Sequence, residues 1–270
     1  MYYVRGSEMN LQRRNHYLSE AYQESFTDET GNVWVKFGDK PPVQRNPRSV
    51  GRQRSMYIRN VKGKENDGIE HFFSTWIETP FAGLAQRIKR ERDEFFLGTA
   101  EEYRVLLRFV GAQAVRTLGH KQCVDIQAGR SVDRNTFLRV MLRQMLTIGE
   151  VWRKNLPRLR FFTMLPYVGE FFISGDHPVL VIQVRDNSVW VPTDEPKQGI
   201  TQLNDILNSP NWGFLLPLTP YTCVWVEPRG GVGPYSALER LEPPQVRHLN
   251  GLLRAQCKLF LLARDRESLN

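Results

Sequence analysis

Hydrophobic residues in the middle of the chain recur at helical spacing. A first helix is expected to begin near Asp67, with Glu70 three residues further on in the pattern of a capping box. Its stripe continues past Pro80, where we expect a kink. The apolar positions of this stripe are Ile69, Phe72, Phe73, Trp76, Ile77, Leu84, Ala85 and Ile88.

Two further helices follow in the same region. Thr99 and Glu102 form a second capping-box pattern, and we expect the helix they open to stop at Gly119. Ser131 or Asp133 can cap the third helix. Their inward positions are Tyr103, Leu106, Leu107, Val110 and Ala114, and then Phe137, Val140, Met141, Met145, Ile148 and Trp152. The centre of the chain is therefore predicted to be a helical layer.

After residue 157 the pattern changes to short apolar runs typical of strands. A last helix can begin at Pro243, and residues 258–263 resemble a final strand. Near the N-terminus, Val33 to Phe37 alternate, which predicts one more strand that joins or covers the main sheet. The other predicted strands are 160–165, 170–174, 179–184 and 222–227.

Helices followed by strands predict an α+β fold: a central helical layer packed on a mostly antiparallel sheet formed largely by the C-terminal half. We expect a single domain over residues 1–270, since hydrophobic residues make up 41% of the chain and can fill a sizeable core. Its parts are an N-terminal arm, strand and basic loop (1–66), the helical layer (67–156) and a strand-rich part (157–270).

The charge balance points to acidic partners. A net charge of +8 and a pI near 9.5 favour nucleic acid or another polyanion. Three widely spaced cysteines without a Cys-x-x-Cys pair argue against a zinc ribbon or a disulfide framework and favour a reducing cytoplasm. No apolar run is long enough for a membrane span, so we expect no membrane partner. The sequence carries no signal for an oligomeric state.

One segment concentrates the positive charge. Residues 45–64 contain seven basic residues and no acidic one, and with few apolar anchors they predict a long surface loop. Such a loop can bind phosphates, or it can simply be solvated. The candidate binding residues are Arg45, Arg48, Arg52, Arg54, Lys62 and Lys64.

The turn Asp176-His177-Pro178 lies between two apolar runs. Its carboxylate and imidazole could bind a divalent metal, or could supply a base and an electrostatic partner. The alternative is structural, because an Asp before x-Pro commonly accepts backbone N–H groups and fixes a turn.

Other polar residues are weaker candidates. His16 could act in catalysis or could lock the N-terminal arm against the sheet. Gln113 and Arg116 share a helical face that could bind phosphate or clamp Asp176, with a salt bridge as the alternative. Glu70 and Glu78 are eight residues apart and share a face only loosely.

Seven short blocks stand in a recognisable order: His16-Tyr17 with Tyr22 and Phe26; Asn46-Pro47-Arg48-Ser49-Val50 with Tyr57; Glu70 and Glu78; Gln113, Arg116 and Thr117; Gly175-Asp176-His177-Pro178-Val179; Pro217-Leu218-Thr219-Pro220; and Asn250. Together they resemble the signature blocks of the DUF4238 family, a bacterial group named only as a domain of unknown function. Ser19, Leu118 and Gly175 depart from the family's pattern, which has Pro, Pro and Ser there. The resemblance spans nearly the whole chain and names no reaction.

Two functional hypotheses follow. The first is a hydrolase that acts on nucleic acid or a phosphorylated substrate, such as a nuclease of a defence or toxin system, with His16, Arg116, Asp176 and His177 as candidate catalytic residues. It predicts that His16 and Asp176 lie close together, and it is compatible with a divalent metal cofactor. The alternative is a non-catalytic binding or regulatory module in which these residues are structural.

Overall fold

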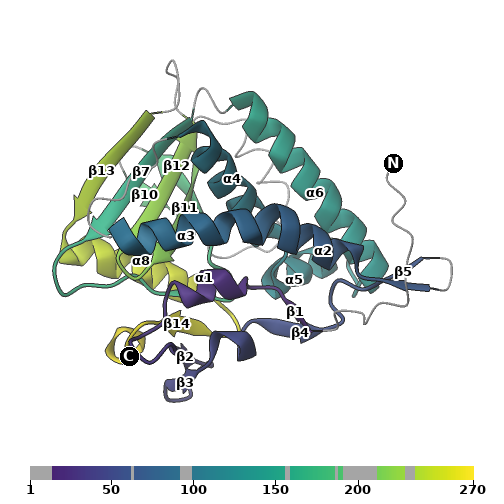
Figure 1. Ribbon diagram of the computed structural model, residues 1–270, viewed down its shortest axis with the longest axis horizontal. Helices are drawn as coiled ribbons and strands as arrows, with labels where there is room; N and C mark the ends of the chain where they lie inside the picture. Colours follow the sequence, from purple (N-terminus) through teal and green to yellow (C-terminus); the bar gives the residue numbers. More distant parts are fainter. Residues whose placement is uncertain are drawn as a thin grey trace.

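The C-terminal half of the chain forms a six-stranded sheet in the order β10-β9-β11-β12-β7-β13 (Figure 1). The computed structural model describes residues 14–61, 64–91, 99–155, 159–185, 188–190, 212–228 and 235–270. Neighbouring strands of this sheet are antiparallel except β13, which runs parallel to β7. The strands are β7 (Leu159–Pro166), β9 (Leu180–Arg185), β10 (Ser188–Trp190), β11 (Trp212–Thr219), β12 (Thr222–Pro228) and β13 (Tyr235–Leu241). The predicted α+β class is confirmed.

Side chains on successive positions of this sheet enter two different cores. Phe214 and Leu216 of β11 pack with the helical layer, while Leu215 between them packs with Leu249 of α8 on the opposite face. The first core also holds side chains from both sides of residue 157. The helices are α1 (Glu20–Glu24), α2 (Gly68–Phe73), α3 (Thr79–Glu91), α4 (Ala100–Val115), α5 (Leu118–Gln127), α6 (Arg134–Asn155) and α8 (Pro243–Gln256). The sheet is therefore covered by helices on both faces, the second of which was not predicted.

Capping explains where two of the helices begin. The predicted capping box of Thr99 and Glu102 opens α4, with both reciprocal hydrogen bonds present. At α6, the carboxylate of Asp133 accepts the N–H of Thr136 at 3.0 Å, so Asp133 rather than Ser131 is the cap.

The expected stop at Gly119 is wrong. The helix α4 ends at Val115, and Gly119 lies in the first turn of α5. The reason is Thr117, whose hydroxyl accepts the N–H of His120 at 3.1 Å and so starts a new helix. Because Thr117 caps α5 two residues before Gly119, the chain is already in a new helix at Gly119 and the glycine ends none.

The first helix also departs from its prediction. Asp67 makes no capping hydrogen bond with its side chain, and Glu70 is buried instead of reaching back to it. The break in α-helical geometry is a π-helical segment, η2 (Ser74–Glu78), that lies between α2 and α3 just before Pro80. Pro80 itself stands in the first turn of α3, directly after this segment.

A second, smaller sheet has the order β3-β2-β14-β8. Its strands are β2 (Val33–Lys36), β3 (Val43–Arg45), β8 (Ser174–Gly175) and β14 (Leu261–Ala263). Val33 and Val35 of β2 are buried, and the C-terminal strand β14 pairs with β2 on one side and β8 on the other. The N-terminal strand β2 therefore belongs to this smaller sheet and not to the six-stranded sheet, since it pairs with the C-terminal strand β14.

The expected long basic loop is structured, which corrects that prediction. Its elements are β3, the 3₁₀ turn η1 (Pro47–Ser49), β4 (Arg52–Arg54) paired with β1 (Arg14–His16), and the hairpin of β5 (Arg59–Val61) and β6 (Lys64–Asn66). The segment has the apolar anchors that were thought to be few: Val50, Met56, Tyr57 and Ile58 are buried. A last 3₁₀ turn, η5 (Glu267–Leu269), closes the chain.

Candidate functional site

Arg116 ends α4 and stands directly before Thr117, the cap of α5. Its side chain is 1% exposed, and its guanidinium carbon lies 4.7 Å from the centre of the Phe73 ring. An arginine keeps its charge inside a protein, so burying it requires acceptors and counter-charges. The residues around Arg116 supply them.

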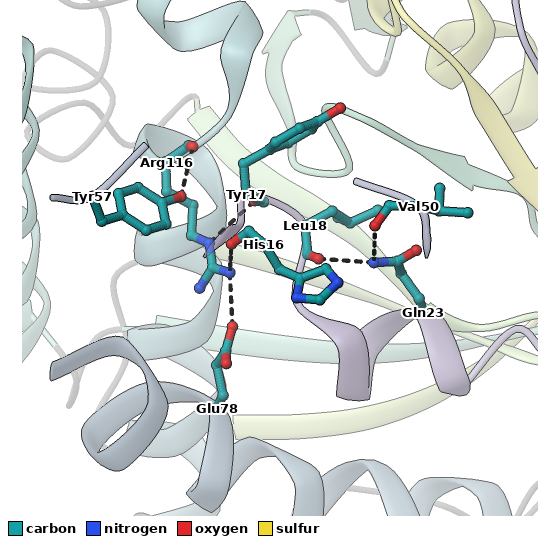
Figure 2. A network of polar contacts seen from close by, with 8 residues as sticks. All are labelled: His16, Tyr17, Leu18, Gln23, Val50, Tyr57, Glu78 and Arg116. Carbon is teal, nitrogen blue, oxygen red and sulfur yellow. Dashed lines mark hydrogen bonds and ion pairs between the residues drawn. The ribbon is translucent and has the colours of Figure 1, made fainter. Parts of the chain in front are cut away.

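Figure 2 shows how the guanidinium joins the N-terminal arm to η2. Its Nε donates to the carbonyl of Tyr17 at 3.1 Å, and its Nη2 donates both to the carbonyl of His16 and to Oε1 of Glu78, the latter at 2.7 Å. The hydroxyl of Tyr57 donates to the carbonyl of Arg116 at 3.2 Å. The salt bridge that the sequence offered as an alternative for Arg116 is confirmed.

The π-helical segment explains why Glu78 reaches this site together with Glu70. Eight residues exceed two α-helical turns by about 0.8 residue, which would rotate Glu78 away from the face of Glu70. A π turn closes its hydrogen bond one residue later, so η2 absorbs that excess and returns Glu78 to the same face. Both carboxylates then act on the charge of Arg116.

Glu70 lies deeper in this group than Glu78. Burial raises the pKa of Glu70 to about 7, Arg116 opposes the rise, and Glu78 adds to it. Asn15 hydrogen bonds to Glu70 and accepts the N–H of Tyr57 at 3.2 Å. Among the described residues, Oε2 of Glu70 and Nη1 of Arg116 are buried without a hydrogen-bond partner. Such atoms are rare in folded proteins. We call Asn15, His16, Tyr57, Glu70, Glu78 and Arg116 the Arg116 cluster.

His16 forms the half-buried edge of the cluster. While its carbonyl accepts from Arg116, its ring points away from the guanidinium (Figure 2). Nε2 lies 3.3 Å from the carbonyl of Arg48, which can only accept, so Nε2 carries the proton and Nδ1 is the basic nitrogen. Burial lowers the pKa of His16, which the bond to Arg48 and the charges of Glu20 and Glu78 oppose. The ring is therefore a neutral base at pH 7.

The basic residues of the sequence lie beside His16. Strand β4 pairs antiparallel with β1, and Arg52 is the direct partner of His16 across the two strands. Arg48 is ion-paired with Glu20 at 2.8 Å. The candidates that are exposed and make no ion pair with another described residue are Arg45, Arg52, Arg54 and Lys64. Lys62 lies outside the described residues.

Asp176 lies in a different environment. It is fully buried, and its Oδ1 accepts the backbone N–H groups of Lys258, Leu259 and Phe260 at 3.1, 3.1 and 3.3 Å. Burial raises the pKa of Asp176, and these three hydrogen bonds oppose the rise. No hydrogen bond joins Asp176 to His16. The expected proximity of His16 and Asp176 stays a prediction, and the contacts of Asp176 favour its structural alternative.

Gly175 shows how tightly the chain is packed beside Asp176. A Cβ at this position would lie 2.4 Å from Sγ of Cys257 and 2.5 Å from the carbonyl of Phe260. Only glycine fits such an approach without a shift of the backbone. The serine of the family's pattern would therefore not fit at this position unless its neighbours moved.

His177 contacts the beginning of α5. Its Nδ1 lies 2.8 Å from Oγ1 of Thr117, and a Cβ on Gly119 would come within 3.2 Å of the same nitrogen. Nearby, Nε2 of His120 donates to Oε1 of Gln144 at 2.7 Å. Burial lowers the pKa of His120 to about 4, and burial together with the charge of His120 lowers the pKa of His177 to about 4. Both imidazoles are neutral at pH 7.

The structure thus brings together only part of the predicted site. Arg116 meets His16 through a backbone carbonyl, and Thr117 links the same helix end to His177. Gln113, on the face of Arg116, is buried with both amide atoms unpartnered among the described residues. Sequence reasoning undervalued Glu70 and Glu78, because their spacing fits one face only after a π turn that sequence periodicity does not reveal.

The described residues contain no group of three or more His, Cys, Asp or Glu side chains arranged to hold a metal ion. In the same part of the chain, no helix has the length and apolarity needed to cross a membrane.

Residues from five of the seven sequence blocks take part in the contacts described above. The chain belongs to the DUF4238 family, whose model, described as a protein of unknown function, matches residues 14–267. No curated protein and no solved structure matches the chain.

Proposed function

We propose that the protein is a hydrolase that acts on nucleic acid or another phosphorylated substrate, which it binds along β1 and β4. The observation that supports this most is the pairing of Arg52 with His16 across the two strands. It sets an imidazole beside exposed cations that make no ion pair with another described residue, all on one short ribbon. Arginine binds phosphate with paired N–H groups, so the ribbon is suited to hold the anion next to the base.

In this proposal His16 is the general base. Its Nδ1 accepts a proton from a water molecule as the water oxygen attacks phosphorus and the bond to the leaving oxygen breaks. The leaving oxygen then takes up a proton from solvent, and the imidazolium of His16 returns its proton to solvent. The hydrogen bond from Nε2 to the carbonyl of Arg48 keeps the ring oriented and its tautomer fixed.

Arg116 serves as a positioning residue, since it holds the backbone carbonyls of His16 and Tyr17. Glu78, whose side chain is 23% exposed, adds negative charge that favours the protonated imidazole as it forms. Glu70 lies behind this pair with its pKa near neutrality.

The second candidate is a non-catalytic binding module. It is favoured by the contacts of Arg116 and Asp176, which go largely to backbone groups. In that case the ribbon would bind a polyanion without changing it.

The test is a product assay on single- and double-stranded DNA, RNA and nucleotides, with and without Mg²⁺ or Mn²⁺. His16→Gln is the informative variant, because its amide can still donate to the carbonyl of Arg48 while it has no basic nitrogen. We expect turnover by the wild type and a loss of about 10²- to 10⁴-fold in His16→Gln, the range for general acid–base groups. Wild-type turnover that survives in His16→Gln would contradict the catalytic role.

Binding is tested separately. Replacing both Arg52 and Arg54 with Gln removes two phosphate contacts and should reduce the slope of log affinity against log salt by about 1.8 on duplex DNA. Arg104→Gln with Arg108→Gln, exposed on α4, is the control with the same charge change. Equal effects of the two double variants would mean that net charge, and not the ribbon, controls binding.

A further inference from the structure

Two exposed aromatic residues lie on the helix that carries the carboxylates of the Arg116 cluster. Phe72 is 37% exposed and Trp76 is 61% exposed, four residues apart across the junction of α2 and η2. Large aromatic side chains lose favourable burial when they face water, so such a pair often marks a binding surface.

The pair is continuous with the cluster. The rings of Phe72 and Phe73 lie 6.0 Å apart, those of Phe73 and Tyr57 lie 5.0 Å apart, and the guanidinium of Arg116 lies over Phe73. Trp76 stands two residues before Glu78, the carboxylate that binds Arg116. The aromatic contacts therefore lead from the buried cluster to the surface.

Exposed cations on the strands before α2 favour an anionic occupant. Arg54 ends β4 three residues before Tyr57, and Lys64 lies on the β5–β6 hairpin that leads into α2. Exposed cations that track a phosphate backbone, interleaved with aromatic rings on which bases stack, are the features of single-strand binding surfaces. Paired bases of a duplex do not offer their faces to such rings.

We propose that Phe72 and Trp76 form a stacking platform for the unpaired bases of single-stranded nucleic acid whose phosphates lie on β4. The inference rests on the proposed function and narrows its substrate class from any phosphorylated compound to a single strand. The position of Trp76 in a π-helical segment is consistent with it, because such segments occur frequently at functional sites.

Fluorescence anisotropy of short labelled strands of DNA and RNA tests the platform, with inorganic polyphosphate as a probe that has charge but no bases. Trp76→Ala should weaken strand binding by about 5- to 150-fold, the range for loss of one base stack. It should leave polyphosphate binding unchanged, and Trp76→Phe should retain most of the strand affinity. Tyr167→Ala, an exposed aromatic on the turn after β7, is the matched control and should change neither affinity.

The outcomes separate the two proposals. Because Trp76 is largely exposed, its variants should keep the wild-type melting temperature, which is measured first. Strand binding that is unchanged in Trp76→Ala but weakened by Arg52→Gln with Arg54→Gln overturns the platform and leaves the phosphate ribbon standing. A wild type that binds neither polyphosphate nor a strand overturns both proposals.

Discussion

The Arg116 cluster and the turn at Asp176 use similar residues for different purposes. Each has a carboxylate and a histidine close to the end of a helix. At Asp176 one carboxylate oxygen accepts three consecutive backbone N–H groups, so the charge defines the path of residues 258–260. In the Arg116 cluster the carboxylates face a side-chain cation instead. Adjacency in sequence, as in Asp176-His177, is therefore poorer evidence for a catalytic pair than adjacency across the fold.

Glu70 on one side, and His120 and His177 on the other, respond to pH in opposite directions. Glu70 has a raised pKa, so the folded state holds its proton more tightly than the unfolded state does. His120 and His177 have lowered pKa values, so the folded state resists their protonation. Stability measurements on single variants can separate these contributions.

The largest expected effect is on stability at Arg116. Arg116→Ala leaves two backbone carbonyls and a carboxylate without their partner, and it should lower the free energy of unfolding by about 3–5 kcal/mol. Urea denaturation measures it. Arg104→Ala breaks an exposed ion pair with Glu101 and should cost less than about 1 kcal/mol. Equal losses in both variants would mean that the cluster does not organise the arm.

Glu70→Gln should show a pH-dependent gain. The folded pKa of Glu70 is about 7 against an ordinary 4.5, so its stabilising contribution is complete below pH 4.5 and is lost as the pH rises through 7. Gln imitates the protonated form. Relative to wild type, the variant should gain up to about 3 kcal/mol between pH 5 and pH 8 in urea denaturation. A difference that does not change with pH would contradict a buried titrating carboxyl.

His120→Gln should show the opposite dependence. The folded pKa of His120 is about 4 against an ordinary 6.5, so the stability of its neutral form is present above pH 6.5 and is lost as the pH falls through 4. The wild type should lose about 2–3 kcal/mol relative to His120→Gln between pH 7 and pH 4. Thermal or urea unfolding across this interval checks the sign, and a relative gain by the wild type on acidification would contradict it.

The last prediction asks whether the negative charge of Asp176 or its acceptor oxygen holds the turn. Asp176→Ala leaves three N–H groups without their acceptor, each at a cost of about 1–3 kcal/mol where it stays shielded from water. Asp176→Asn keeps an acceptor carbonyl and should cost less than Asp176→Ala. If both variants lose the same stability, the negative charge rather than hydrogen-bond acceptance holds the turn.

Much of the fold was predictable, because periodicity and caps are local signals. The capping box at Thr99, the helix from Pro243 and the strand after residue 158 all appear where the pattern put them. The partner of β2 was not predictable, because pairing with β14 joins residues more than 220 positions apart and depends on the path of the whole chain.

The candidate site was predictable only as a set of residue types. His16 and Arg116 were selected, and they do meet, but through a backbone carbonyl that no side-chain pattern records. The sequence explained Glu70 as a capping residue. That Glu70 and Glu78 lie on one face beside Arg116 could not be predicted, because it depends on the π-helical segment η2. The basic candidates that the structure describes are exposed as expected, while the anchoring of their segment by buried Tyr57 was missed.

The most direct test of the account compares two folded variants in one product assay on single-stranded nucleic acid. His16→Gln and Asp176→Asn each remove one ionisable group and keep the hydrogen bonds that hold it. We predict that His16→Gln loses about 10²- to 10⁴-fold of the wild-type rate while Asp176→Asn keeps a rate close to wild type. Loss of the rate in Asp176→Asn with retention in His16→Gln would contradict the account and move the active site to the Asp176 turn.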